Sequence, residues 1–120
     1  MIKSIRGEIT MAIIEKRPVQ AKKGKGEITI THLLTPQELA DKCAMFAKVT
    51  IPPGASIGTH FHNGNTETYH ILQGEALYNN NGEEIKITAG TTTFCPDGEQ
   101  HGIENIGSDD LVFMALIINS

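Results

Sequence analysis

The sequence predicts an all-β protein, a barrel or sandwich of short strands. Alternating or apolar strand-like runs recur about every 8–12 residues along the chain. No segment has the pattern of a helix longer than about two turns. The Asn81-Gly82 pair lies between two such runs, 75–78 and 84–88, and Asn-Gly between strand-like runs is the strongest short hairpin signal. The C-terminal run 111–118 is apolar at nearly every position and reads as a further, buried strand.

Composition favours one globular domain and argues against several kinds of partner. The chain has 120 residues, 39% of them hydrophobic, and a formal net charge of −4. A nucleic-acid-binding domain generally has a basic face, and a membrane span needs roughly 20 apolar residues. We therefore expect neither nucleic acid nor a membrane as partner. Cys43 and Cys95 are too few for a disulfide framework and no apolar leader begins the chain, so we expect a cytoplasmic location.

The N-terminal quarter combines strand-like runs with a basic loop. Residues 9–14 are an apolar, β-like run. Residues 16–26 are predicted to form a loop, because Pro18 and two glycines interrupt them. This loop holds five of the ten Lys and Arg residues. It is either a solvated, mobile loop or a lid that attracts anions to the mouth of the barrel.

A strand and a short helix are predicted next. Residues 27–34 alternate between apolar and polar side chains, as a half-buried strand does. Thr35, Pro36 and Glu38 then form a capping-box pattern, which predicts a short helix that ends near Lys42.

The remaining strands follow in close succession. The run 44–51 alternates and ends at Pro52-Pro53-Gly54. Further strands are predicted around His60 and over 67–72 and 91–95, in addition to the hairpin. Because the run 111–118 is apolar on both faces, one face should line the barrel and the other should be covered by another sheet or a second subunit. A homodimer is therefore expected.

Two histidines and a glutamate in the middle of the chain point to a metal site. His60 and His62 are two residues apart, so in a strand they face the same side. Gly64 and its asparagine neighbours favour a turn, after which the next strand brings Glu67 back towards the same point. Two imidazoles and a carboxylate that converge in this way suit a divalent transition metal.

The chain resembles the cupin family in two motifs. Gly54–Gly74 matches G-x5-H-x-H-x4-E-x6-G, and Gly90–Asn105 matches G-x5-P-x-G-x2-H-x3-N, at every fixed position. The resemblance implies a double-stranded β-helix, the jelly-roll barrel of this family, as a single domain over residues 1–120. Residues 1–43 would carry the N-terminal strands and the basic loop, and 44–118 the metal-binding barrel. The implied metal ligands are His60, His62, Glu67 and His101.

Such a site has room for a small anion. Three neutral imidazoles and one carboxylate around a divalent ion leave one positive charge, and an ion that prefers six ligands keeps two positions open. Oxalate, a 2-oxo acid or an acidic sugar fragment would suit it. Mn or Fe is favoured, although Ni, Co, Cu and Zn also suit imidazole and carboxylate ligands; zinc usually takes four ligands, which would leave it little room for substrate.

Other residues near the motifs are weighed as supporting groups. Tyr69 has the parity of Glu67, so it is expected to face the cavity as a catalytic candidate. His70 stands where many cupins have an aromatic residue, and it is either an acid–base group or a surface residue. Pro96 and Gly98 are expected to aim His101, and Asn105 to hold the loop backbone. The expected barrel-lining residues are Phe46, Phe94, Phe113 and Met114; Cys95 is expected to be buried and inert, and His32 to lie in the core or an interface.

Several functions remain open on the same ligand set. The motif spacing is similar to the oxalate decarboxylase and germin-like group, which implies a metal-dependent enzyme acting on a small carboxylate. Decarboxylases of that group use an additional acid as proton donor, and neither Glu99 nor Glu104 can be assigned that role. A dioxygenase, a sugar-acid isomerase and a non-catalytic, metal-dependent binding protein are the alternatives. A regulatory domain separated from a transcription factor is a weaker one.

Overall fold

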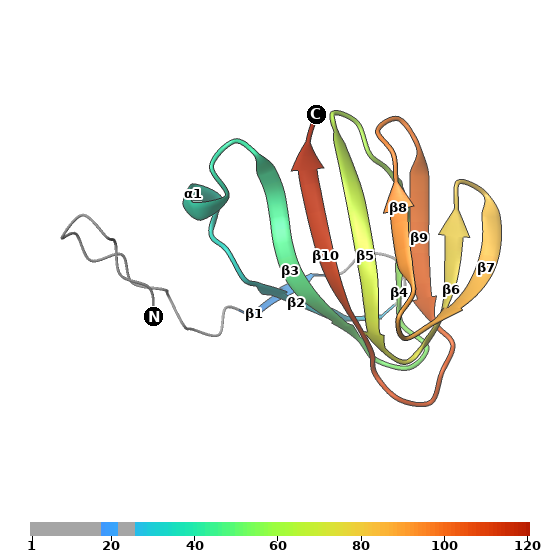
Figure 1. Cartoon of the computed structure of the whole chain (residues 1–120). Coiled ribbons are helices and arrows are strands. Elements are labelled where there is room, and N and C mark those ends of the chain that lie inside the picture. Colours follow the sequence, from blue (N-terminus) through green and yellow to red (C-terminus); the bar gives the residue numbers. More distant parts are fainter. Residues whose placement is uncertain (1–17, 22–25) are drawn as a thin grey trace.

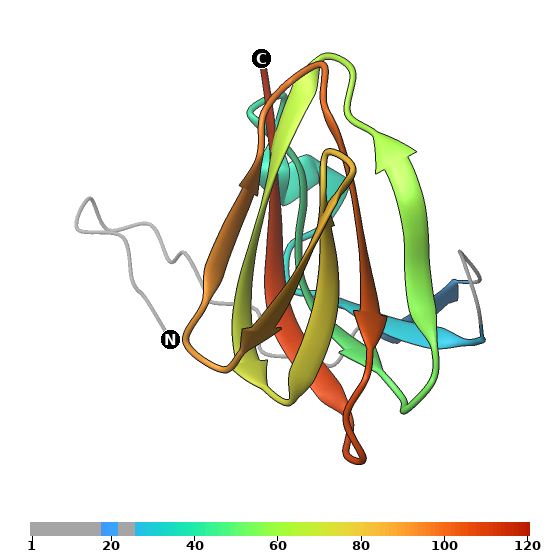
Figure 2. The same cartoon turned by 90° about the vertical axis from the view of Figure 1, so that its right-hand side faces the viewer.

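The computed structural model describes residues 18–21 and 26–120, which form two antiparallel β-sheets packed face to face (Figures 1 and 2). The larger sheet has the order β1 (Pro18–Ala21), β2 (Ile28–His32), β3 (Cys43–Ile51), β10 (Leu111–Asn119), β5 (Asn65–Gln73) and β8 (Thr92–Cys95). The smaller sheet has the order β4 (Ser56–Phe61), β9 (Gln100–Asn105), β6 (Glu75–Asn80) and β7 (Glu83–Thr88). The predicted all-β, double-stranded β-helix fold is confirmed.

The chain crosses repeatedly between the two sheets, and this brings distant segments to one end of the barrel. β10 lies between β3 and β5, and β9 lies between β4 and β6. The turn after β4, the loop between β8 and β9 and the C-terminus all lie at the upper end of the molecule in Figures 1 and 2. Residues from three separate stretches of sequence can therefore meet there.

The local turn and cap predictions are confirmed. The helix α1 (Pro36–Leu39) has a complete capping box, in which Glu38 N donates to Thr35 Oγ1 and Thr35 N donates to Glu38 Oε1. It ends before Lys42, because Ala40 already has a positive φ of 54°. Asn81 and Gly82 join β6 to β7 with φ values of 51° and 101°, the conformation of a tight hairpin turn. No helix in the described part of the chain is long and apolar enough to cross a membrane.

The N-terminal prediction needs one correction. The expected loop 16–26 contains the strand β1, which pairs with β2 from Pro18 opposite Thr31 to Ala21 opposite Ile28. Pro18 is tolerated because it is the first residue of an edge strand, where a missing N–H costs little. The predicted run 9–14 lies outside the described residues, as do Lys22, Lys23 and Lys25 of the proposed lid.

Strand alternation corrects the predicted barrel lining. On β10, Leu111, Phe113 and Ala115 are fully buried between the sheets, whereas Val112, Met114 and Leu116 are half-buried. Met114 therefore lies on the outer face, and Phe46 lies there too, as the cross-strand partner of Leu116. Phe94 is 56% exposed on β8, with the buried Thr93 and Cys95 on either side of it.

Of the four residues expected to line the barrel, only Phe113 does so. The apolar character of a residue does not reveal its face; its parity in the strand does. The predicted burial of both faces of 111–118 is likewise found only on the inner face, from Leu111 to Ala115, since the outer side chains keep part of their surface exposed within the single chain.

Candidate metal centre

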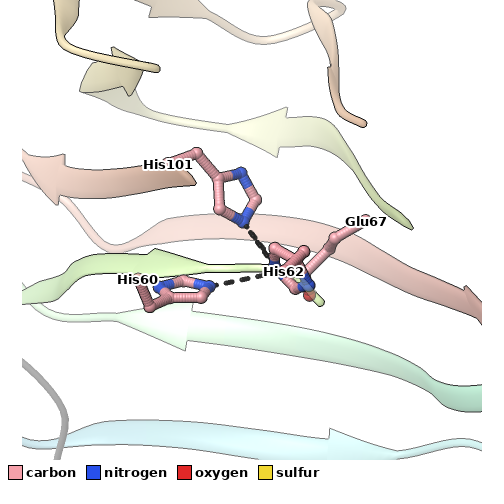
Figure 3. Close-up of side chains that lie close together, drawn as sticks. All are labelled: His60, His62, Glu67 and His101. Atoms are coloured by element: carbon pink, nitrogen blue, oxygen red, sulfur yellow. Dashed lines mark hydrogen bonds and ion pairs between the residues drawn. The ribbon is translucent and has the colours of Figure 1, made fainter. Parts of the chain in front are cut away.

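Four side chains from three strands and a turn converge on one point (Figure 3). His60 is the penultimate residue of β4 and pairs with His101 of β9 across the sheet. His62 follows β4 in the turn, where its backbone N–H donates to Glu99 O and its carbonyl accepts from Gly98 N. Glu67 enters from β5 of the opposite sheet. The structure thus brings together all four predicted ligands.

The distances show how closely the four side chains approach. Glu67 Oε1 lies 2.9 Å from His101 Nε2, 3.0 Å from His62 Nε2 and 3.6 Å from His60 Nε2. The Nε2 atoms of His62 and His101 are 3.0 Å apart. The four ligand atoms, one from each residue, all lie within 4.8 Å of one another.

A hydrogen bond at Nδ1 fixes the orientation of each imidazole. His60 Nδ1 lies 2.8 Å from the Gly58 carbonyl oxygen, and His62 Nδ1 lies 2.6 Å from Asn65 Oδ1. A carbonyl oxygen only accepts, so in the neutral imidazole these two Nδ1 atoms carry the proton, and Nε2 is the nitrogen that can bind a metal ion. His101 Nδ1 lies 2.8 Å from Tyr78 Oη, which can accept in the same way. All three Nε2 atoms can therefore serve as metal ligands.

This donor set fits a divalent cation. Two nitrogen lone pairs as close as those of His62 and His101 repel each other unless a proton or a cation lies between them. Ligand atoms side by side on a six-coordinate ion, at about 2.1 Å from it, are about 3.0 Å apart. The separations of 2.9 to 3.0 Å among Glu67, His62 and His101 match that spacing, whereas His60 Nε2 lies farther out, 3.6 Å from Glu67 Oε1.

The charges at the site also suit a cation. Burial acts to raise the pKa of Glu67, but hydrogen bonds from His101 and His60 outweigh it and lower the pKa to about 2. Burial lowers the pKa of His101, against the opposing pull of Glu67. The carboxylate is therefore ionised and the His101 imidazole tends to be neutral, the forms that bind metal.

Comparison with known proteins agrees with this geometry. Residues 47–117 match the family model described as a cupin domain. The chain belongs to the cupin family. It is 45% identical over 95 residues to a Thermotoga maritima protein named oxalate-binding protein, covering 79% of this cupin and 78% of that relative.

A solved structure and a longer enzyme also match. A crystal structure from Thermotoga maritima, described as a predicted oxalate decarboxylase, superposes with a TM-score of 0.84 at 40% identity and covers 88% of this cupin and 95% of that chain. Bacillus subtilis oxalate decarboxylase is 27% identical over 113 aligned residues, a match that covers 89% of this cupin but only 28% of the larger enzyme.

Tyr69 belongs to the centre of this cupin, and His70 does not. The Tyr69 ring is stacked on His101, with 4.8 Å between ring centroids and 20° between planes, and it packs against Phe113. Burial and the nearby Glu67 carboxylate raise its pKa, so its hydroxyl stays protonated. His70 points to the outer face of the same strand, where it is exposed and its Nδ1 lies 2.8 Å from Thr92 Oγ1. The structure therefore places His70 away from the candidate catalytic residues.

Sequence reasoning missed two supporting residues. Tyr78, on β6, holds His101, and Asn65, treated only as a turn former, holds His62. The motif spacing gives no signal for Tyr78. The role of Asn65 could have been predicted, because Asn65 follows His62 by only three residues, across a predicted turn. The expected role of Asn105 is confirmed, since its side-chain amide donates to Ile51 O and Asp109 O and accepts from Gly107 N.

A cavity of about 160 Å³ adjoins the metal centre. Three candidate ligands and Tyr69 form its polar end, and apolar side chains form the rest. Its lining residues are Ile28, Ile30, Met45, Val49, Ile57, His60, His62, Glu67, Tyr69, Ala115 and Ile117. Neither Glu99 nor Glu104 is among them, so within the described residues Glu67 is the only carboxyl group that lines the cavity.

Proposed function

We propose that this cupin binds a small carboxylate, oxalate or a 2-oxo acid, at a divalent metal ion held by His60, His62, Glu67 and His101. The observation that carries the proposal is the convergence of three oriented Nε2 atoms and one carboxylate oxygen beside a cavity of small-molecule size. A divalent ion with one carboxylate ligand retains one positive charge, which attracts an anion. The relatives named oxalate-binding protein and predicted oxalate decarboxylase support the choice of a carboxylate.

Each residue has a distinct task in this proposal. The three imidazoles and Glu67 hold the ion. The buried Tyr69 O–H, which interacts with Glu67 in this structure, would turn to an oxygen of the bound ligand. When bound, the ion supplies Lewis-acid polarisation of that ligand, and redox chemistry if it is Mn or Fe. We favour Mn or Fe because four protein ligands leave a six-coordinate ion two positions for the carboxylate, whereas zinc would be nearly saturated.

The residues that line the cavity favour binding of the carboxylate without turnover over its decarboxylation. Release of CO₂ from a carboxylate leaves a carbanion that must take a proton, and an acid near the ligand would supply it. Apart from Glu67, the described lining holds no carboxyl group, and the pKa of Tyr69 is raised, which makes it a weak acid. Decarboxylation is a second candidate, with Tyr69 as the proton donor that the geometry offers.

We also propose that this cupin is a cytoplasmic homodimer without nucleic-acid or membrane partners. The outer face of the larger sheet carries the partly exposed Phe46, Met114 and Leu116 next to one another on β3 and β10. A second copy that covered this face would complete the burial expected of the C-terminal strand. Free Cys43 and Cys95 fit a reducing compartment.

Metal analysis combined with titration tests the central proposal. Protein purified without chelator should contain close to one Mn or Fe per chain, and calorimetry on the loaded protein should detect oxalate or pyruvate binding. Glu67→Gln should lose most of the metal while its circular dichroism stays unchanged. His70→Ala, a change of the outward-facing histidine on the same strand, is the matched control and should retain full metal content. Normal metal content in Glu67→Gln would refute the ligand assignment.

Carbon dioxide release during incubation with oxalate would favour decarboxylation over binding alone. Its absence in metal-loaded protein that binds oxalate would favour the binding protein.

A further inference from the structure

The cavity beside the metal centre is polar at one end and apolar along its body. Ile28, Ile30, Val49, Ile57 and Ile117 form most of the apolar wall, with Met45 and Ala115. Ile28 and Val49 are only 1% exposed, so this wall is part of the core, while Ile30 and Ile117 are half-buried. Among the described residues, no lysine or arginine lines the cavity.

This lining distinguishes between ligands of different charge. A divalent ion with Glu67 carries one positive charge, so a monoanion makes the site neutral and a dianion such as oxalate makes it negative. An unpaired charge next to a hydrocarbon wall is costly, because nothing there replaces its hydration. With no lysine or arginine in the described lining, that excess charge has no cationic partner there.

The shape of the lining distinguishes between ligands of different polarity. A small acid that chelates through its carboxylate and the adjacent oxygen leaves its remaining substituent directed away from the ion. In oxalate that remainder is two more oxygens, whereas in a 2-oxo acid with an alkyl chain it is hydrocarbon. The volume of about 160 Å³ is close to that of an apolar protein cavity of about 150 Å³ that accepts benzene.

We propose that the preferred ligand is a monoanionic 2-oxo acid whose short, linear or branched hydrocarbon chain occupies the cavity between β2, β3, β4 and β10. This inference rests on the proposed function, because it assumes a carboxylate bound at the metal centre. In this inference the apolar lining of the cavity, mainly isoleucines, determines which acid binds, whereas the motif residues only hold the metal ion.

A homologous series of acids tests the inference on Mn²⁺-loaded protein. Calorimetry with pyruvate, 2-oxobutyrate, 2-oxopentanoate and 4-methyl-2-oxopentanoate should show the dissociation constant falling about fourfold for each added methylene until the cavity is full. The longer acids should bind more tightly than oxalate. Metal-free protein should bind none of them, which separates chelation from non-specific apolar binding.

A pair of neighbouring isoleucines provides matched variants. Ile117 lines the cavity, whereas Ile118 is 44% exposed and does not. Ile117→Thr should flatten the gain per methylene and leave the affinity for pyruvate within about twofold, with metal content unchanged. Ile118→Thr should behave as the unaltered protein does.

The outcomes separate this inference from the proposed function. If oxalate binds more tightly than every 2-oxo acid, or affinity does not rise with chain length, the inference is overturned and carboxylate binding stands. If no acid binds to protein with full metal content, the proposed function itself fails.

Discussion

Replacing Tyr78 by phenylalanine should weaken metal binding although Tyr78 is not a metal ligand. Its hydroxyl lies 2.8 Å from His101 Nδ1, and the His101 side chain is completely buried. Once His101 Nε2 binds a metal, Nδ1 must carry the proton, and Tyr78 is the acceptor that satisfies this N–H. Without the hydroxyl, a buried donor is left unpaired, at a cost of about 1–3 kcal/mol.

That cost falls mainly on the metal-bound state. In the metal-free protein, His101 can carry its proton on Nε2 and donate to Glu67 Oε1, 2.9 Å away, so Nδ1 needs no acceptor. We therefore expect Tyr78→Phe to lose about 10–100-fold in metal affinity, the range found when a partner of a ligating histidine is removed. Competition with a chromogenic chelator for Mn²⁺ or Co²⁺ measures this loss directly.

Tyr69→Phe is the matched control for this experiment. It also removes a buried hydroxyl, but the Tyr69 ring meets His101 by stacking alone, and the change leaves the ring in place. The Tyr69 hydroxyl interacts with the Glu67 carboxylate, for which a bound metal ion would itself be a partner, and not with His101. Metal affinity should change less than about threefold, while carboxylate affinity should fall. Wild-type metal affinity in Tyr78→Phe, or an equal loss in both variants, would refute the role assigned to the Tyr78–His101 bond.

Four further predictions concern pH, assembly and the core. Metal affinity should fall steeply below about pH 6, since imidazoles must be deprotonated to bind; full occupancy at pH 4 contradicts this. The folded-state pKa values of Glu67 and His101 are both lowered, so the folded protein binds fewer protons than the unfolded chain. The melting temperature of metal-free protein should therefore decline as pH falls from about 6.5 towards 2, and less steeply in Glu67→Gln. Leu116→Glu should shift the sedimentation coefficient from dimer to monomer without metal loss, whereas Ile85→Glu on the other sheet should not. Phe113→Ala, in the fully buried core, should cost about 3–5 kcal/mol of unfolding free energy in urea titrations; a cost below about 1 kcal/mol would contradict its core position.

The sequence was sufficient for features that depend on residues close together in the chain. The capping box at Thr35 and the Asn81-Gly82 turn each lie within a few residues, and both form as predicted. The ligands His60, His62 and Glu67 lie within eight positions of one another, so strand parity and one turn placed them. The position of His101, 34 residues beyond Glu67, followed from resemblance to a family and not from periodicity.

Features that depend on the register between distant strands could not be predicted from the sequence. Phe94 and Phe113 are equally apolar, yet Phe94 lies on the outer face and Phe113 in the core. Their positions within their strands decide this, in a sheet whose strand order the sequence does not give.

The contact between Tyr78 and His101 also depends on strand register. β6 pairs with β9 with Asn80 opposite His101 and Tyr78 opposite Ile103, and only this register sets the Tyr78 hydroxyl against Nδ1. The motif residues provide the candidate ligand atoms, and the pairing of β6 with β9 fixes which nitrogen of His101 faces the candidate metal site. A shift of that register by one residue would turn Tyr78 to the other face of the sheet, so metal affinity depends on strand pairing as well as on the ligands.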